Sequence, residues 1–252
     1  MKAFIINLAK DKERRQFMEE QMRKLNIPYE IITGTVGAGL SIKDRNTLYS
    51  PDLAMKENGH ELSNSQIGIA DSHRKAYERI LQEKLPWALI LEDDVLLDQR
   101  IISVLDDKFV TESGADWIQI DYVPMNNTFI TNWIKATIKR TNKSHRFIFY
   151  ALVKIPWLIL WGMYEYTREL LARKGRPRAV NFLRPLYLAS AYIVTDKGIK
   201  KMQPLYSPLR FAADRLQNQA RIKNNLHLKA VVPLLAKQER ERFASNQIYD
   251  NE

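Results

Sequence analysis

A strongly apolar run that predicts a buried strand ends abruptly in three adjacent carboxylates, Glu92, Asp93 and Asp94. Like charges so close together repel one another, so the cluster alone adds nothing to the stability of a fold. We therefore expect a positive charge among them. A divalent cation that holds a diphosphate is the first candidate, because hard cations take oxygen ligands. Glu92 and Asp94 would point to one side of an extended strand and Asp93 to the other. The alternative is a solvated acidic turn.

The first residues of the chain predict the start of a parallel sheet. Residues 3–8 are apolar enough for a buried strand, and Asp11 can cap a helix that runs to about Leu25. A second strand at 29–33 leads into a loop with glycines at 34, 37 and 39. This strand-helix-strand order is typical of a parallel sheet with helices on its faces.

The rest of the chain continues the alternation of helix and strand. Ser63 or Ser65 can begin a helix from about Ile67 to Lys84. Polar and apolar residues alternate over 116–121, which predicts a strand with one accessible face. Later elements are expected at 187–194 (strand), from Thr195 or Asp196 (helix), at 214–222 (helix) and at 227–235 (strand), followed by a polar tail from 236. We predict a single α/β domain over residues 1–252.

The positive charge of the chain is concentrated in one segment. The net charge is +10, and residues 127–185 hold twelve Lys or Arg but only two acids, while the rest of the chain is balanced. An apolar run at 147–164 is interrupted by Lys154 and Pro156. Spanning a bilayer takes roughly 20 mostly apolar residues and a central Lys is costly there, so we expect no transmembrane helix.

We interpret residues 127–185 as a basic, aromatic-rich, helical insertion that faces an anionic membrane surface. Its Trp and Tyr side chains suit the headgroup region and its Lys and Arg suit anionic lipid. The alternative is a helical subdomain that packs its aromatic residues inward. The chain has no cysteine, which excludes disulfides and thiolate metal sites. The apolar run after Met1 is too short for a signal peptide. We expect a cytoplasmic protein, peripheral on the inner face of the membrane.

Several motifs, in order, resemble those of glycosyltransferase family 25, the lipooligosaccharide galactosyltransferase group. They are Asn7-Leu8 with Arg14-Arg15, Gln66-Ile67-Gly68 with Ser72-His73, Leu91–Val95, Ala191–Val194 with Gly198, Pro208 with Asp214, and Pro233 with Gln238. The resemblance covers most of the chain outside 127–185. The chain departs from the family pattern at Ala70-Asp71, before Ser72, and at Thr33-Gly34, where the family commonly has Asp-Gly.

The resemblance implies a GT-A-type, Rossmann-like fold that binds a nucleotide sugar, with Mn²⁺ or Mg²⁺ as cofactor. It implies inverting transfer of galactose from UDP-galactose to a lipooligosaccharide or lipopolysaccharide core glycan. The metal candidates are Asp94 and Glu92. The donor-binding candidates are Arg14, Thr33, Ser72, His73, Asp93 and Gln238. Asp214 is the first candidate for the general base and Asp121 the second. His227 competes weakly with Gln238 as a third metal ligand.

Each of these residues also has a purely structural interpretation. Asp214 could be a helix N-cap acid, Arg14 a solvated cation and His73 a structural hydrogen-bonding group. Two other functions use the same features: a nucleic-acid-binding or metal-dependent nuclease-like protein, and a non-catalytic membrane-surface protein. The excess of basic residues is confined to one apolar-rich segment, so we expect no nucleic acid partner. UDP-glucose and UDP-N-acetylhexosamine stay open as alternative donors.

Overall fold

The computed structural model describes residues 1–123, 155–182 and 184–243. The chain divides into two compact units, one made of Met1–Tyr122 with Arg178–Glu252 and the other of Val123–Pro177. We call the first the sheet unit and the second the 123–177 unit. The predicted insertion overlaps the second unit, and the part of it at 127–154 lies outside the described residues.

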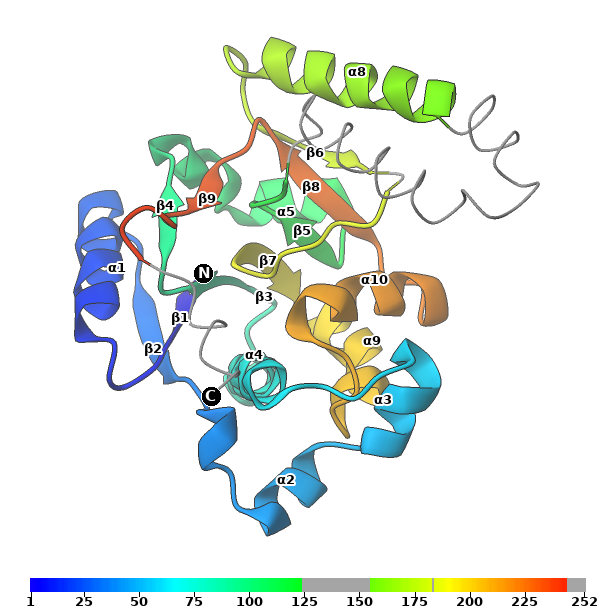
Figure 1. Ribbon diagram of the computed structural model, residues 1–252. Coiled ribbons are helices and arrows are strands. Elements are labelled where there is room, and N and C mark those ends of the chain that lie inside the picture. The colour runs from blue at the N-terminus through cyan, green and yellow to red at the C-terminus, as the bar shows by residue number, and fades with distance from the viewer. Residues whose placement is uncertain (124–154, 183, 244–252) are drawn as a thin grey trace. The chain divides into compact units, whose positions relative to one another are not determined.

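A mixed seven-stranded sheet organises the sheet unit, in the order β2-β1-β3-β7-β5-β8-β6 (Figure 1). Strands β2, β1, β3, β5 and β8 run in one direction, while β7 and β6 run in the other. The bounds are β1 Ala3–Asn7, β2 Tyr29–Thr33, β3 Trp87–Glu92, β5 Trp117–Gln119, β6 Arg178–Asn181, β7 Ala191–Thr195 and β8 Leu228–Val232. The carboxyl ends of the five parallel strands therefore share one edge with the start of β7. A parallel sheet was predicted, and the sheet is mostly parallel, with β6 and β7 antiparallel to their neighbours.

Most helix starts follow from capping residues in the sequence. The helices of the sheet unit are α1 Lys12–Leu25, η1 Gly37–Gly39, α2 Ile42–Leu48, α3 Pro51–Asn58, α4 Asn64–Gln82, η2 Gln99–Val104, α5 Asp107–Ser113, α9 Asp196–Tyr206 and α10 Ala213–Lys223. Ser63 caps α4 in a reciprocal capping box with Gln66. Thr195 caps α9. Asp11 stands at the N-cap of α1, but its side chain accepts no capping hydrogen bond there.

Helices cover both faces of the sheet. Met18 and Met22 of α1 join η2, α5 and one face of the strands in an apolar cluster. Helices α4, α9 and α10 contact one another and strands β1, β2, β3, β7 and β8. In the 123–177 unit, α8 spans Ile155–Ala172. Among the described helices, none is long and apolar enough to cross a membrane.

Two strand predictions need correction. The segment 116–121 has no accessible face, because Asp116, Gln119 and Asp121 are all at least 97% buried. Its polar side chains are satisfied internally instead: the Gln119 amide donates to Asp121 Oδ1 at 2.9 Å and accepts from the Trp117 indole at 2.7 Å. The strand predicted at 187–194 begins only at Ala191, since Leu188 has a positive φ of 80° that turns the chain.

The predicted polar tail also contains a strand. Residues Ala236–Gln238 form β9, which pairs antiparallel with β4 at Val95–Leu97. Strand β4 follows the three acids directly, so this small second sheet brings the end of the described chain back to them. The backbone N–H of Glu239 donates to the carbonyl oxygen of Asp94 at 2.7 Å.

Candidate functional site

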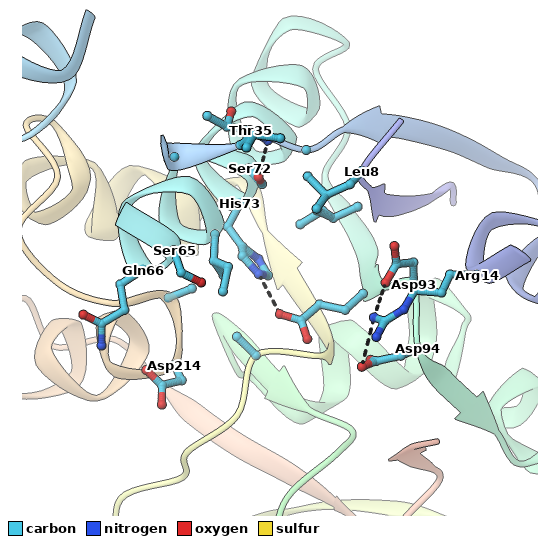
Figure 2. A pocket seen from close by; sticks show the side chains of 18 of the residues that line it. Leu8, Arg14, Thr35, Ser65, Gln66, Ser72, His73, Asp93, Asp94 and Asp214 are labelled. Carbon is cyan, nitrogen blue, oxygen red and sulfur yellow. Dashed lines mark hydrogen bonds and ion pairs between the residues drawn. The ribbon is translucent and has the colours of Figure 1, made fainter. Parts of the chain in front are cut away.

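A cavity of about 560 Å³ lies at the carboxyl edge of the parallel strands (Figure 2). Its walls come from the ends of β1 and β3, the loop after β2, the first half of α4, the start of α10 and the segment after β9. The predicted site residues that line it are Arg14, Ser72, His73, Glu92, Asp93, Asp94, Asp214 and Gln238. This edge is where open α/β sheets bind ligands.

Close glycine packing forms the wall between α4 and the loop after β2. A Cβ atom added at Gly68 would lie 2.5 Å from the carbonyl oxygen of Thr35 and 2.7 Å from the backbone nitrogen of Gly37. The absence of side chains there lets the helix backbone meet the loop backbone. Ser72 then ties the two together, because its hydroxyl accepts from the Thr35 N–H at 2.8 Å and donates to the Gly68 carbonyl at 2.7 Å. The predicted motif residues Gly68 and Ser72 thus shape the cavity wall.

Asp93 and Asp94 form a turn after β3 and are both more than 90% buried, which excludes the solvated acidic turn. Asp93 accepts from the Asn7 amide at 2.7 Å and from Arg14 Nη1 at 3.0 Å. Arg14 also donates to Asp94 Oδ2 at 3.4 Å. The extended geometry expected to set Glu92 and Asp94 on one side and Asp93 on the other does not continue past Glu92. Because the strand ends at Glu92, the turn directs both aspartates towards the same guanidinium.

Burial raises the pKa of both aspartates. For Asp93 the Asn7 and Arg14 hydrogen bonds oppose this effect. For Asp94 burial and the charge of Glu92 together raise the pKa to about 6, against the opposing charge of Arg14. Within the described residues, the Asp94 Oδ1 atom is buried and has no hydrogen-bond partner. A buried carboxylate oxygen without a donor favours the binding of a cation.

The donor set fits a metal ion only in part. Within the residues that the structure describes, no three His, Cys, Asp or Glu side chains come together as a metal site. Asp94, with its unpartnered oxygen, and Glu92 both line the cavity and are the predicted protein ligands. One or two carboxylates completed by substrate phosphates are typical of Mg²⁺ sites. The cavity therefore fits a metal that arrives with, or is completed by, a diphosphate.

Glu92 lies among the other carboxylates of this edge. It accepts from the Gln238 amide at 3.3 Å and lies 3.4 Å from His73 Nε2. Its negative charge contributes to the raised pKa values of Asp94, Asp121 and Asp214. Burial is the largest cause of the raised pKa of Asp214, and the neighbouring Arg215 opposes it.

Asp214 lines the cavity on the side away from Arg14, Asp93 and Asp94 (Figure 2). It stands in the first turn of α10, whose N-cap is Ala212, so Asp214 is not the N-cap acid of the structural interpretation. The cavity therefore has carboxylates at both ends. Asp93 and Asp94 lie beside Arg14 at one end. Asp214, at the other end, has no charged hydrogen-bond partner in the described part of the chain.

Three sequence candidates lie elsewhere. Thr33 ends β2 with an exposed side chain, and the next residues, Gly34 and Thr35, line the cavity in its place. Asp121 is 1% exposed and accepts hydrogen bonds from Ser190, Gln119 and the Ala191 N–H, outside the cavity lining. His227 directly precedes β8 and therefore lies at the opposite, amino-terminal edge of the parallel strands. Its side chain is exposed.

Several lining residues were not predicted. Lys10, Arg240 and the known candidate Arg14 give the cavity three cationic side chains, a setting that suits a diphosphate. Arg240 donates to Gln238 Oε1 from Nε and from Nη2, at 3.2 and 2.8 Å. No local sequence signal marks Lys10 or Arg240, because each is one cation among many. Asn7 belongs to a noted motif, and its role beside Asp93 depends on the register of β1 with β3.

Comparison with known proteins agrees with this geometry. A model of the family described as glycosyltransferase family 25 (LPS biosynthesis protein) matches residues 1–217. Procollagen galactosyltransferase 1-A of Xenopus laevis is 24% identical over 121 residues, which are 45% of this chain and 20% of that protein. Human procollagen galactosyltransferase 2 is also 24% identical over 121 residues, covering 45% and 19%.

A bacterial relative matches a similar share of the chain. A Haemophilus influenzae protein, assigned provisionally as a glycosyltransferase, is 25% identical over 109 residues, which are 43% of this chain and 38% of that protein. The matches thus span less than two fifths of each relative. The family model, in contrast, matches most of this chain and includes every predicted site residue except Gln238 and the weaker candidate His227. The chain therefore belongs to glycosyltransferase family 25.

Proposed function

We propose that this chain is a metal-dependent, inverting glycosyltransferase of GT-A type that transfers galactose, or a related hexose, from a UDP-sugar to a lipooligosaccharide or lipopolysaccharide core glycan. The observation that carries the proposal is the unpartnered, buried Asp94 Oδ1 in a cavity that also holds Lys10, Arg14 and Arg240. The family and the galactosyltransferase names of the relatives support the donor class.

The aspartate end of the cavity would hold the diphosphate. Asp94 and Glu92 would bind Mn²⁺ or Mg²⁺, which would offset the negative charge that develops on the leaving UDP. Lys10, Arg14 and Arg240 would contact phosphate oxygens through charge-assisted hydrogen bonds. Asp93, already held by Asn7 and Arg14, would keep the Arg14 guanidinium in place.

The opposite end would receive the acceptor. Asp214 would take the proton of the acceptor hydroxyl as that oxygen bonds to the anomeric carbon, while the bond from this carbon to UDP breaks. Burial raises the pKa of Asp214, which makes its carboxylate a stronger base. Attack from the side opposite the leaving group inverts the configuration.

A lipid-linked acceptor on the inner face of the cytoplasmic membrane completes the proposal. Helix α8 carries large apolar side chains that are about half or more exposed: Trp157, Leu160, Met163, Tyr164, Leu170 and Leu171. Exposed cations follow it at Arg173, Lys174 and Arg176. An exposed apolar stripe followed by cations suits an anionic lipid surface.

UDP binding is the direct test of the donor site. We expect Mn²⁺ with UDP to raise the melting temperature of the wild-type protein and EDTA to abolish the shift. With UDP-galactose and Mn²⁺, slow release of UDP should exceed that with UDP-glucose or UDP-N-acetylhexosamine.

Asp94→Asn should lose the metal-dependent part of UDP binding and keep the fold. Glu112→Gln removes an exposed acid of α5 that does not line the cavity. This control should keep both the fold and the metal-dependent UDP binding. Equal UDP binding by Asp94→Asn and wild type would remove Asp94 from the metal site. No binding of any UDP-sugar by the wild type would contradict the proposed function.

A further inference from the structure

Three motifs that are far apart in the sequence converge on one carboxylate, Glu92. Ser72-His73 brings His73 Nε2 to 3.4 Å from Glu92 Oε1. Ala191-Tyr192 brings the Tyr192 hydroxyl to 2.7 Å from the other ring nitrogen, His73 Nδ1. The last motif brings the Gln238 amide to 3.3 Å from Glu92 Oε2. None of these contacts is explained by metal or diphosphate binding.

The interior chain extends one step further. The Tyr192 hydroxyl lies 3.0 Å from the Tyr77 hydroxyl, and Tyr77, Tyr192 and His73 are all at most 1% exposed. The Tyr192 ring stacks on Trp117 at 3.7 Å and on His73 at 5.8 Å between ring centroids. A hydrogen-bonded chain therefore runs from the packed interface between α4 and β7 to a carboxylate in the cavity.

The chemistry of the groups fixes the direction of the hydrogen bond to Glu92. A carboxylate only accepts, so His73 Nε2 carries the proton that faces Glu92. The other ring nitrogen, Nδ1, pairs with the Tyr192 hydroxyl, which pairs in turn with the Tyr77 hydroxyl.

The same reasoning fixes the second chain. The Gln238 Oε1 atom accepts twice from Arg240, which leaves the Gln238 amide N–H₂ to donate to Glu92. Each oxygen of Glu92 thus receives one donor, one from the protein core and one from the last residue of β9.

We propose that His73, Tyr192 and Gln238 are positioning residues that hold Glu92 from opposite sides, with His73 donating to Glu92 through Nε2–H. Hydrogen-bond partners of this kind orient a carboxylate and keep its lone pairs directed at a ligand. The Nε2 proton and the contacts do not depend on the reaction. The effect on turnover rests on the proposed function.

The Nε2 proton can be observed directly by long-range ¹H–¹⁵N NMR of the histidine rings at neutral pH. The chain has four histidines, so a His73→Gln spectrum identifies the resonances of His73 by subtraction. We expect a ring that carries a proton on Nε2. Tyr192→Phe should shift the Nδ1 resonance of His73, because Nδ1 loses its hydroxyl partner while the stacked ring stays. A ring without a proton on Nε2 would overturn the proposal, whether or not the protein is active.

Tyr206→Phe is a matched control. The Tyr206 ring contacts Tyr77 at 5.4 Å between centroids, but in the described structure its buried hydroxyl has no hydrogen-bond partner and is not part of the chain. The Nδ1 resonance of His73 should be the same in Tyr206→Phe and wild type. An equal shift in both variants would show that the probe reports general repacking, and the proposal would fall.

Turnover supplies the second readout. We expect Tyr192→Phe to lower kcat by roughly 10–100-fold, the usual effect of removing a group that orients a ligating side chain. Tyr77→Phe, one step further away, should have a smaller effect, and Tyr206→Phe none. Each rate is compared at a temperature well below the melting temperature of the variant. Full kcat in folded Tyr192→Phe, with wild-type transferase activity established, would contradict the positioning role and leave the proposed function standing.

Discussion

Acidic side chains at the carboxyl edge of the sheet have very different surroundings. Asp93 has a neutral amide and a guanidinium as donors, whereas Asp94 keeps one oxygen without a partner in the described structure. Asp121 lies deeper, with three donors and almost no exposure. Burial is the main cause of the raised pKa of all three. The hydrogen-bond partners therefore separate their roles, with Asp94 available to a ligand and Asp121 held in the core.

The buried position of Asp121 predicts a pH dependence of stability. Burial raises the pKa of Asp121 from 3.8 to about 7, so the folded protein holds a proton that the unfolded chain has released between these values. Stability contributed by this proton is present at about pH 4 and is lost as the pH rises towards 7. The loss is on the order of 4 kcal/mol, from about 1.36 kcal/mol per pKa unit.

The Asp121→Asn variant has no carboxyl group at this position and so cannot take up the proton that stabilises the folded wild type. Relative to wild type, its free energy of unfolding should therefore increase as the pH rises from about 4 to about 7. Urea denaturation of both proteins at a series of pH values measures the difference. Parallel curves for the two proteins across this range would show that Asp121 is ionised in the folded state throughout.

At the scale of elements, the site depends on how closely α4 approaches the loop after β2. Ala is favoured over Gly within a helix by about 1 kcal/mol. At Gly68, however, the new Cβ atom would meet backbone atoms of Thr35 and Gly37 at 2.5 and 2.7 Å. Overpacking of this kind costs about 1–3 kcal/mol, so Gly68→Ala should destabilise the protein and weaken UDP binding. Thermal unfolding and UDP titration measure the two effects.

Gly39→Ala is the control for this variant. A Cβ atom at Gly39 would lie 3.9 and 4.0 Å from atoms of Val36, which is ordinary contact, and both stability and UDP binding should hold. If Gly68→Ala were as stable as Gly39→Ala, the loop would be free to move away from α4, and the packing would not define the cavity wall.

An element could be predicted when its own residues show a clear sequence pattern. The acid cluster, α1, β2 and the Ser63 cap of α4 were predictable because each has its own signal. Strand β9 was missed because three residues carry too little pattern, and its pairing with β4 is what brings Gln238 to Glu92. The segment 116–121 was given an accessible face because polar residues that satisfy one another inside a core look like solvent-facing residues in a sequence.

For the molecule as a whole, the basic and apolar character of α8 and its flank predicts adsorption to anionic membranes. We expect the protein to co-sediment with phosphatidylglycerol vesicles but not with phosphatidylcholine vesicles, with binding weakened by salt. Replacing Trp157, Leu160 and Leu171 together by Ser should abolish co-sedimentation and preserve UDP binding, because these side chains are 55%, 67% and 73% exposed.

Exposed apolar residues of the sheet unit give the matched control. Ile42 and Ile222 are 80% and 76% exposed, and their replacement by Ser should leave vesicle binding unchanged. If both variants lost vesicle binding equally, general surface hydrophobicity would explain the binding. If the α8 variant still bound vesicles, the exposed apolar side chains of α8 would have no role at the membrane.

Two residues that contact each other in the site are far apart in the sequence, which has a consequence for synthesis. Glu92 and Gln238 are 146 residues apart, and the ribosome adds roughly 5–20 residues per second. A nascent chain therefore presents the acids of β3 for roughly 7–30 seconds before Gln238 and Arg240 are made. During that interval Asn7, Arg14 and His73 are already synthesised. The protein can thus form the His73 contact to Glu92 before the Gln238 contact, whose donor is made much later.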